Sequence, residues 1–125
     1  MRNHSRKSDA RKNYMDMIVI HTPKLRWQVL ENGMVEISMV HRGFYDRIAQ
    51  QVFHKPRVSR IMLDCYGSKL WLAVDGEHTV YDIVQYMIYS FPAEEDGMLE
   101  RVVAFMRILQ RQRFVEIYGN EKEQI

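Results

Sequence analysis

Residue types that carry chemistry in enzymes are present in this sequence, but their spacing matches no known kind of catalytic or metal site. The five histidines are scattered singly and have neither the helical pairing nor the cysteine partners of a zinc site: His4, His21, His41, His54 and His78. Cys65 is the only cysteine, and no histidine lies near it in the sequence to serve as its base. We therefore predict no metal ligands and no catalytic nucleophile, and we expect Cys65 to be a buried structural thiol.

The glycines and the acidic residues indicate no enzyme either. The glycines are isolated, so that no dinucleotide-binding or phosphate-binding loop can be written through them. Acidic residues cluster only at positions 94–96, at the start of a predicted helix, where capping and the helix dipole explain them. We predict no catalytic residues, no enzymatic activity and no cofactor.

The compact polar segment of residues 75–79 is explained by structure alone. Asp75-Gly76 is typical of a turn, and Thr79 with Asp82 three residues later is typical of a capping box at a helix start. Trp71 lies on the inward face of the helix expected before this turn, which favours a place in the core over a ligand platform.

The elements that must position these residues begin with a β-hairpin. Residues 26–30 and 34–40 flank Asn32-Gly33, a strong hairpin signal because both residues tolerate positive φ. In the second arm apolar and polar residues alternate, so one face is expected to be buried.

Two further elements follow the hairpin. Apolar residues at helical spacing predict a short amphipathic helix within residues 41–56, ended by Pro56. Residues 57–64 form a third predicted strand. Its faces carry Ser59, Ile61 and Leu63 on one side and Val58, Arg60 and Met62 on the other.

Three helices are expected beyond Gly67, so the chain is predicted to be an α+β protein. The first runs from about residue 68 to residue 74, with Ser68 as its N-cap. The second follows Thr79 with an unbroken apolar stripe and ends before Pro92. The third runs from about residue 94 to residue 113, and residues 114–118 form a terminal strand or extended return.

Composition bounds the class of protein. Of 125 residues, 46% are hydrophobic and 27% charged, which is typical of one globular domain. The longest apolar run, residues 70–74, is far shorter than the roughly 20 residues of a membrane span. The basic N-terminus lacks the apolar region of a secretory signal, and the single cysteine favours a reducing cytoplasm. We therefore predict a cytoplasmic protein without membrane partners.

The charge is unevenly distributed and suggests domain boundaries. Residues 1–13 carry five basic residues against one acidic residue, so we expect a basic, disordered tail there. Residues 14–118 are expected to form one domain, with an insertion at 41–56, and residues 119–125 a polar tail. The body has a slight acidic excess, which is not typical of a nucleic-acid-binding domain.

Two features point to a binding role. A lone third strand beside a hairpin leaves an open sheet edge, which offers backbone groups to an added strand. Ile108 lies off the apolar stripe of the third helix, near Arg101 and Ala104, and could help to form the floor of a peptide-binding groove. Around the strand, five basic residues outnumber the single acidic Asp46 and would attract an acidic peptide: Arg42, Arg47, Lys55, Arg57 and Arg60.

A combined motif extends from the third strand into the helices. It reads IMLDCYGSKLW over residues 61–71, DGEHTV over 75–80 and DI at 82–83, and continues with Glu100-Arg101, Phe105 and Leu109. This pattern resembles the PqqD-like family over about residues 20–118. The region of residues 44–56, with Asn32-Gly33 before it, is similar to the longer stand-alone branch of that family.

The resemblance implies a winged-helix-like module, a small three-stranded antiparallel sheet packed on a three-helix bundle, called a RiPP recognition element. Such modules have no catalytic activity. They bind the leader segment of a ribosomally made precursor peptide and present it to a modifying enzyme, often a radical SAM enzyme. The leader adds to the third strand, against the third helix. The implied peptide-binding residues here are Arg57, Val58, Ser59, Arg60, Ile61, Met62, Leu63, Arg101, Ala104, Phe105 and Ile108.

Several alternatives stay open. Winged-helix folds commonly bind DNA through the third helix, although acidic residues at 94–96 and Glu100 would face the phosphates with like charge. A protein scaffold unrelated to peptide modification is another possibility, as is a homodimer. The peptide, its pathway (pyrroloquinoline quinone or another product) and the roles of the insertion and the basic tail are also open. Strand addition predicts that Ile61→Pro or Met62→Pro abolishes peptide binding.

Overall fold

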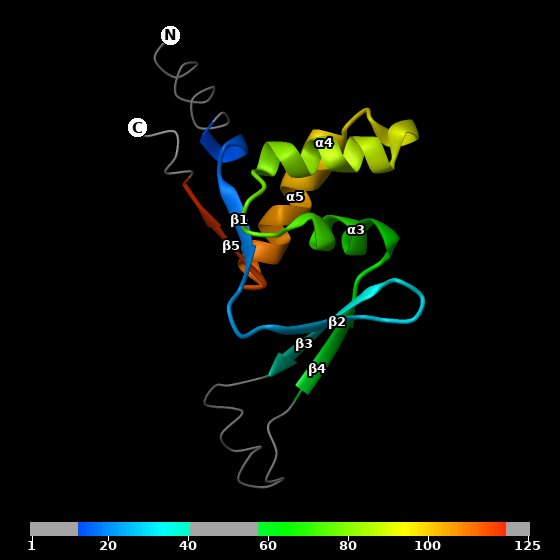
Figure 1. Ribbon diagram of the computed structural model, residues 1–125, viewed down its shortest axis with the longest axis vertical. Coiled ribbons are helices and arrows are strands. Elements are labelled where there is room, and N and C mark those ends of the chain that lie inside the picture. Colours follow the sequence, from blue (N-terminus) through cyan, green and yellow to red (C-terminus); the bar gives the residue numbers. More distant parts are fainter. Residues whose placement is uncertain (1–12, 41–57, 120–125) are drawn as a thin grey trace, which may run out of the picture. The chain divides into compact units, whose positions relative to one another are not determined.

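The structure is a computed structural model that describes residues 13–40 and 58–119 of the chain (Figure 1). The chain divides into two compact units. Unit 1 comprises Met1–Thr22 and Lys69–Ile125, and unit 2 comprises Pro23–Ser68. The helix predicted within residues 41–56 and the basic tail over residues 1–12 lie outside the described residues. The fold is mixed α and β, as the sequence predicted.

Unit 2 contains a three-stranded antiparallel sheet in the order β2-β3-β4 (Figure 1). The strands are β2 (Arg26–Val29), β3 (Val35–Val40) and β4 (Val58–Met62), each within two residues of its predicted bounds. Val35 and Ile37 of β3 are fully buried, while Glu36 between them and Ser38 after them are partly exposed. The hairpin, the third strand and the alternation of faces are therefore confirmed.

The hairpin turn is not of the type in which Asn32 and Gly33 both have positive φ. The Leu30 N–H donates to the Met34 carbonyl at 2.8 Å, and the Gly33 N–H donates to the Leu30 carbonyl at 2.9 Å. Only Gly33, at φ 83°, is left-handed in this turn. These bonds define a three-residue loop with a glycine bulge, and the Asn32 side chain supports it by accepting from the Met34 N–H at 2.9 Å.

Helix α3 (Cys65–Ala73) begins three residues earlier than the sequence predicted. Its N-cap is Asp64, whose Oδ1 accepts from the Gly67 N–H at 2.7 Å. The prediction that Ser68 caps this helix is therefore wrong. The expectation that Cys65 is buried is also wrong, because the cysteine is exposed in the first turn.

Ser68 connects the first turn of α3 with the end of the sheet. Its Oγ accepts from the Val35 N–H at 2.8 Å and donates to the Leu63 carbonyl at 3.2 Å. The Leu63 N–H donates directly to the Val35 carbonyl at 2.8 Å. The hydroxyl thus replaces the second bond of this strand pair, in a position where Ser68 is only 3% exposed.

Unit 1 contains a second, two-stranded sheet (Figure 1). β1 (Ile18–His21) pairs antiparallel with β5 (Val115–Tyr118), so that Val19 lies opposite Ile117. The terminal strand was predicted, but β1 was not. On its other side β1 bonds to the turn at residues 75–78, which precedes helix α4 (Val80–Ser90). There the Gly76 N–H donates to the Val19 carbonyl at 3.1 Å.

Helix α4 (Val80–Ser90) follows the sequence prediction closely. Thr79 is its N-cap, and the capping box with Asp82 is complete, since each side chain accepts from the other residue's backbone N–H at 3.1 Å. Four residues of the predicted stripe are buried: Val80, Ile83, Val84 and Met87.

The predicted third helix is divided in two. A short 3-10 helix, η1, spans Pro92–Glu94, and α5 spans Met98–Arg111. Between them Gly97 has φ 79°, a left-handed conformation that an α-helix cannot contain. Residues 94–96 therefore precede α5, so the predicted start of this helix at residue 94 is wrong; within α5 the acidic residue of the first turn is Glu100.

Trp71 is fully buried, as predicted, and its ring stacks on that of His21. The ring centroids are 4.1 Å apart, and His21 Nε2 lies 2.9 Å from the Trp71 carbonyl oxygen. Burial lowers the pKa of His21 below its ordinary value, and the bond to Trp71 and the charge of Asp75 only partly oppose this effect.

This pKa shift predicts how stability depends on pH. Protonation of His21 is disfavoured in the folded chain, so the unfolded chain binds the proton more readily. The free energy of unfolding is expected to decrease as the pH falls from about 7.5 to about 5.5, through the ordinary pKa of histidine. Urea titrations at both pH values check this. His21→Phe, which keeps an aromatic ring for stacking, should reduce the difference; an undiminished difference would rule out His21 as its source.

Within residues 13–40 and 58–119, every helix is too short or too polar to span a bilayer.

Candidate functional site

β4 forms one edge of the sheet in unit 2, and its bonds to β3 determine which backbone groups point outward. The Leu63 N–H donates to the Val35 carbonyl, and Ile61 lies two residues back along the same ladder. In an antiparallel ladder, residues that bond to the partner strand alternate with residues whose backbone groups point away. The N–H and C=O groups of Arg60 and Met62 therefore point away from β3.

The outer side of β4 is an open edge within residues 13–40 and 58–119, because no strand of those ranges pairs with it. Arg60 is exposed, and the Met62 side chain is 59% exposed. An extended peptide could therefore bond to the backbone of Arg60 and Met62 without breaking a strand pair of the described sheet.

The solvent-facing side of this sheet carries a row of three polar residues. The register places Ser38 of β3 between Arg26 of β2 and Arg60 of β4, on one face. The two arginines lie on strands that are separated by two strand spacings, so their Cα atoms are about 10 Å apart. Neither arginine has an ion pair in the described part of the chain. The row is therefore a positively charged strip beside the open edge.

Sequence reasoning missed Arg26 as a member of this strip. Counting outward from the Asn32-Gly33 turn would have paired it with Ser38, because hairpin register follows from the turn. The strip also could not be assembled without the pairing of β3 with β4, which links residues separated by the 41–56 insertion.

Three of the four residues predicted as the contact face of α5, which lies in unit 1, are exposed. Arg101, Ala104 and Ile108 are exposed, with Ile108 at 52%, and Phe105 is partly buried. Arg101 forms an ion pair with Glu94 at 3.5 Å, in which both side chains are about half exposed. Residues three and four positions apart in a helix lie on the same side, so Arg101, Ala104, Phe105 and Ile108 share one side of α5.

The predicted peptide-binding residues are thus found in two places. Ser59, Arg60, Ile61 and Met62 lie in β4 and Leu63 directly after it, while the α5 residues belong to the other unit. Val58 begins β4, and Arg57 lies outside the described residues. So do three of the other basic residues predicted around the strand: Arg42, Arg47 and Lys55.

The described histidines have structural partners. His21 stacks on Trp71, and His78 Nδ1 lies 2.9 Å from Asp75 Oδ2 at the surface. Over residues 13–40 and 58–119, no group of three or more potential metal-ligating side chains comes together.

Comparison with known proteins gives one match. Residues 52–115, just over half of the chain, match the family described as "Coenzyme PQQ synthesis protein D (PqqD)". The matched segment includes β4, α3, α4 and α5. No curated protein and no solved structure matches the chain.

Proposed function

The chain belongs to the PqqD family, and on this basis we propose that it binds the leader segment of a ribosomally made precursor peptide. The leader adds as an extra strand to β4. The chain is a non-catalytic cytoplasmic chaperone that presents the peptide to a modifying enzyme, of radical SAM type. Whether the product is pyrroloquinoline quinone or another modified peptide is set by the peptide and enzyme that it meets.

The observation that carries the proposal is the open edge of β4. Its outward backbone groups belong to Arg60 and Met62, which are both exposed, and strand addition needs such a row of donors and acceptors. The family resemblance assigns the leader to this strand rather than to β2, the other edge of the sheet. It also assigns contacts to Arg101, Ala104, Phe105 and Ile108 of α5, and a winged-helix arrangement to the whole domain.

The sheet also indicates the side-chain pattern of the peptide. Residues of an added strand share a face with the β4 residues beside them. On one face they lie beside Arg60 in the Arg26–Ser38–Arg60 strip, where an acidic side chain is favoured. On the other face they lie beside Ile61, on the side of the sheet where Ile37 is buried, so apolar side chains are favoured. The proposed ligand alternates acidic or polar with apolar residues.

Hydrogen exchange with a bound peptide tests this proposal. Peptides are selected from a random display library on the immobilised full chain, and amide exchange is measured by NMR with and without a synthetic copy. We expect the amides of Arg60 and Met62 to become protected, because they gain partners. The Val29 amide, which points away from β3 on the opposite edge, is the matched control and should exchange as before.

Two outcomes would contradict strand addition on β4: no peptide is enriched, or an enriched peptide protects Val29 and leaves Arg60 and Met62 unchanged. Binding of nuclease-sensitive nucleic acid in a parallel capture from the native host would instead favour the DNA-binding alternative. The acidic residues before α5 (94–96) and Glu100 argue against that alternative.

A further inference from the structure

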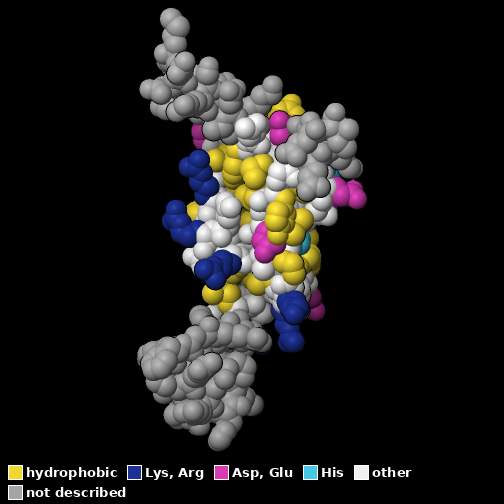
Figure 2. Space-filling view, turned by 90° about the vertical axis from the view of Figure 1, so that its left-hand side faces the viewer, with side chains coloured by type: hydrophobic (Ala, Val, Ile, Leu, Met, Phe, Trp, Pro, Cys, Tyr) yellow, Lys and Arg dark blue, Asp and Glu magenta, His cyan; other side chains and the backbone are white. Residues whose placement is uncertain are grey.

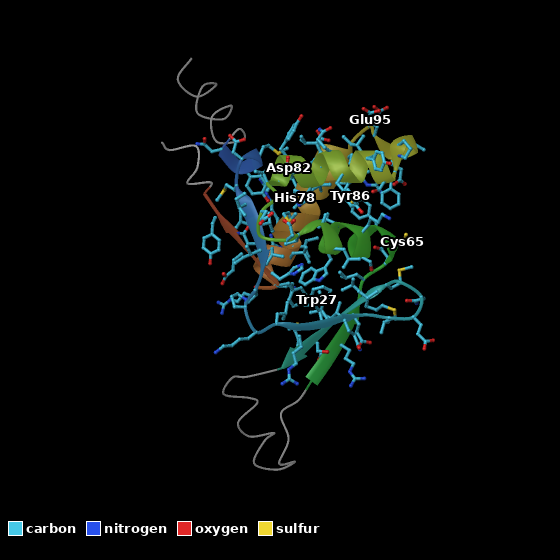
Figure 3. All side chains as sticks on the ribbon, in the orientation of Figure 1. Trp27, Cys65, His78, Asp82, Tyr86 and Glu95 are labelled. Atoms are coloured by element: carbon cyan, nitrogen blue, oxygen red, sulfur yellow. The ribbon has the colours of Figure 1, made fainter. Side chains whose placement is uncertain are left out.

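Unit 1 has a hollow of about 230 Å³ that the proposed function does not use. It lies between the end of α3, the turn at residues 75–78 and the first half of α4. Figure 3 labels His78, Asp82 and Tyr86, three of its lining residues, in this region. The complete lining is Leu72, Ala73, Asp75, His78, Asp82, Ile83 and Tyr86.

The hollow combines an apolar floor with an acidic wall. Leu72 is 46% exposed and offers apolar surface for a ligand to cover, while Ile83, which is almost fully buried, lies at the base of the hollow. Asp75 and Asp82 supply two carboxylates, and no lysine or arginine is among the lining residues. His78 is the only basic group there, and it is already paired with Asp75 at 2.9 Å.

Both carboxylates are held in place by backbone bonds. Asp75 Oδ1 accepts from the N–H groups of Glu77 and His78, each at 2.9 Å. Desolvation alone would raise the pKa of Asp75, but these bonds and the charge of His78 lower it below its ordinary value, so the carboxylate stays ionised. Asp82 Oδ2 accepts from the Thr79 N–H at 3.1 Å.

One acceptor remains available. Asp82 Oδ1 has no hydrogen-bond partner among the described residues, because the bond to Thr79 uses Oδ2. The Tyr86 ring, one helical turn further along α4, is 41% exposed at the same hollow. A carboxylate oxygen and an aromatic face over an apolar floor match a side chain with an aliphatic stem and a cationic head.

The surroundings favour a protein as the source of that side chain. Tyr89 follows Tyr86 at helical spacing and is 83% exposed. Exposed tyrosines are typical of protein interfaces, where arginine is also enriched. Figure 2 shows that hydrophobic side chains also reach the surface on another face of the described chain. Arginine fits this hollow better than lysine, since a guanidinium can stack on the tyrosine ring and still donate to one oxygen.

We propose that this hollow is a docking site for an arginine side chain on the surface of a partner protein. Its stem covers Leu72, and its guanidinium donates to Asp82 Oδ1 beside the Tyr86 ring. The site uses residues of α3, the 75–78 turn and α4, and none of β4. Its existence is therefore independent of the peptide-binding function proposed above.

Titration of the ¹⁵N-labelled full chain with N-acetylarginine amide tests the proposal. We expect saturable chemical-shift changes at Ala73, Asp75, His78 and Tyr86. N-acetylcitrulline amide, which has almost the same shape without the charge, should bind about fivefold more weakly, as the loss of a charge-assisted bond predicts. Equal binding of the two probes, or no change at these residues with arginine, would overturn the proposal.

Variants make the test specific. Asp82→Asn keeps an oxygen for the Thr79 N–H but replaces the free acceptor with a donor, so arginine binding should be lost. Asp96→Asn, an equal change of charge at an exposed residue outside the hollow, should have no effect. Tyr86→Leu provides a second variant, expected to weaken binding, that leaves the capping box intact. Equal effects of Asp82→Asn and Asp96→Asn would overturn the proposal. The proposal would also be wrong if the chemical shifts of the hollow residues changed with protein concentration in the absence of probe, because the hollow would then bind a second copy of this chain.

Discussion

Replacing Met62 with proline is expected to reduce the affinity for a selected peptide about tenfold or more while the domain stays folded. The Met62 N–H points away from β3, so proline removes no bond of the sheet but deletes one donor of the open edge. A lost hydrogen bond accounts for about fivefold, and the proline ring also occupies the space that an added strand would approach. Calorimetric titration of the variant with the peptide measures the effect.

The same sheet provides the controls. Met62→Ala removes the side chain but keeps the N–H, so it should retain most of the affinity. Val29→Pro places proline at an outward position of β2, where Val29 is 50% exposed, and should not change binding. If Met62→Pro bound the peptide as well as Met62→Ala, strand addition at this position would be wrong.

The register also distinguishes between the two substitutions that the sequence suggested. Ile61 lies in the bonded set of residues that face β3, so Ile61→Pro breaks the ladder itself. Loss of binding in that variant would not separate a missing peptide contact from an unfolded sheet. Met62→Pro makes that separation.

Replacing Ser68 with alanine is expected to lower the free energy of unfolding by about 2–4 kcal/mol. The Ser68 hydroxyl bridges the Val35 N–H and the Leu63 carbonyl in a buried position. Alanine leaves both backbone groups short of a partner, and each such buried group costs about 1–3 kcal/mol. Urea unfolding of the variant and of the unsubstituted chain measures the difference.

Ser38→Ala is the matched control. Ser38 lies on the solvent-facing side of the same sheet, and its hydroxyl has no hydrogen-bond partner within residues 13–40 and 58–119. Its loss should therefore change the free energy of unfolding by no more than about 0.5 kcal/mol. An effect of Ser68→Ala as small as that of Ser38→Ala would show that the bridge does not stabilise the sheet.

Local patterns in the sequence determined most of the secondary structure. The Asn32-Gly33 turn, the alternation in β3 and the capping box of Thr79 with Asp82 each depend on residues a few positions apart. Such signals can be read without the fold. The family resemblance likewise depended on short motifs that follow one another along the chain, and the match over residues 52–115 confirms the family.

The sequence predictions were wrong where the fold uses a residue differently from what its local sequence pattern suggests. Ser68 is a good N-cap residue, but its hydroxyl is taken by the end of the sheet, and Asp64 caps the helix instead. Residues 94–96 fit a helix start by charge, yet the left-handed Gly97 separates them from α5. β1 was missed because its partner, β5, lies nearly a hundred residues away, and a short strand has no signal without its partner.

The sequence by itself therefore determined the family, the main helices and the third strand with its two faces, because these depend on short-range spacing. Only the tertiary structure decided which backbone groups of β4 are open, since that depends on the register between β3 and β4. It also decided that Arg26 and Arg60 form one strip and that Asp75, Asp82 and Tyr86 line one hollow. The physical reason is that hydrogen-bond register and side-chain packing bring together residues that are far apart in the chain. No local sequence pattern shows which distant residues become neighbours.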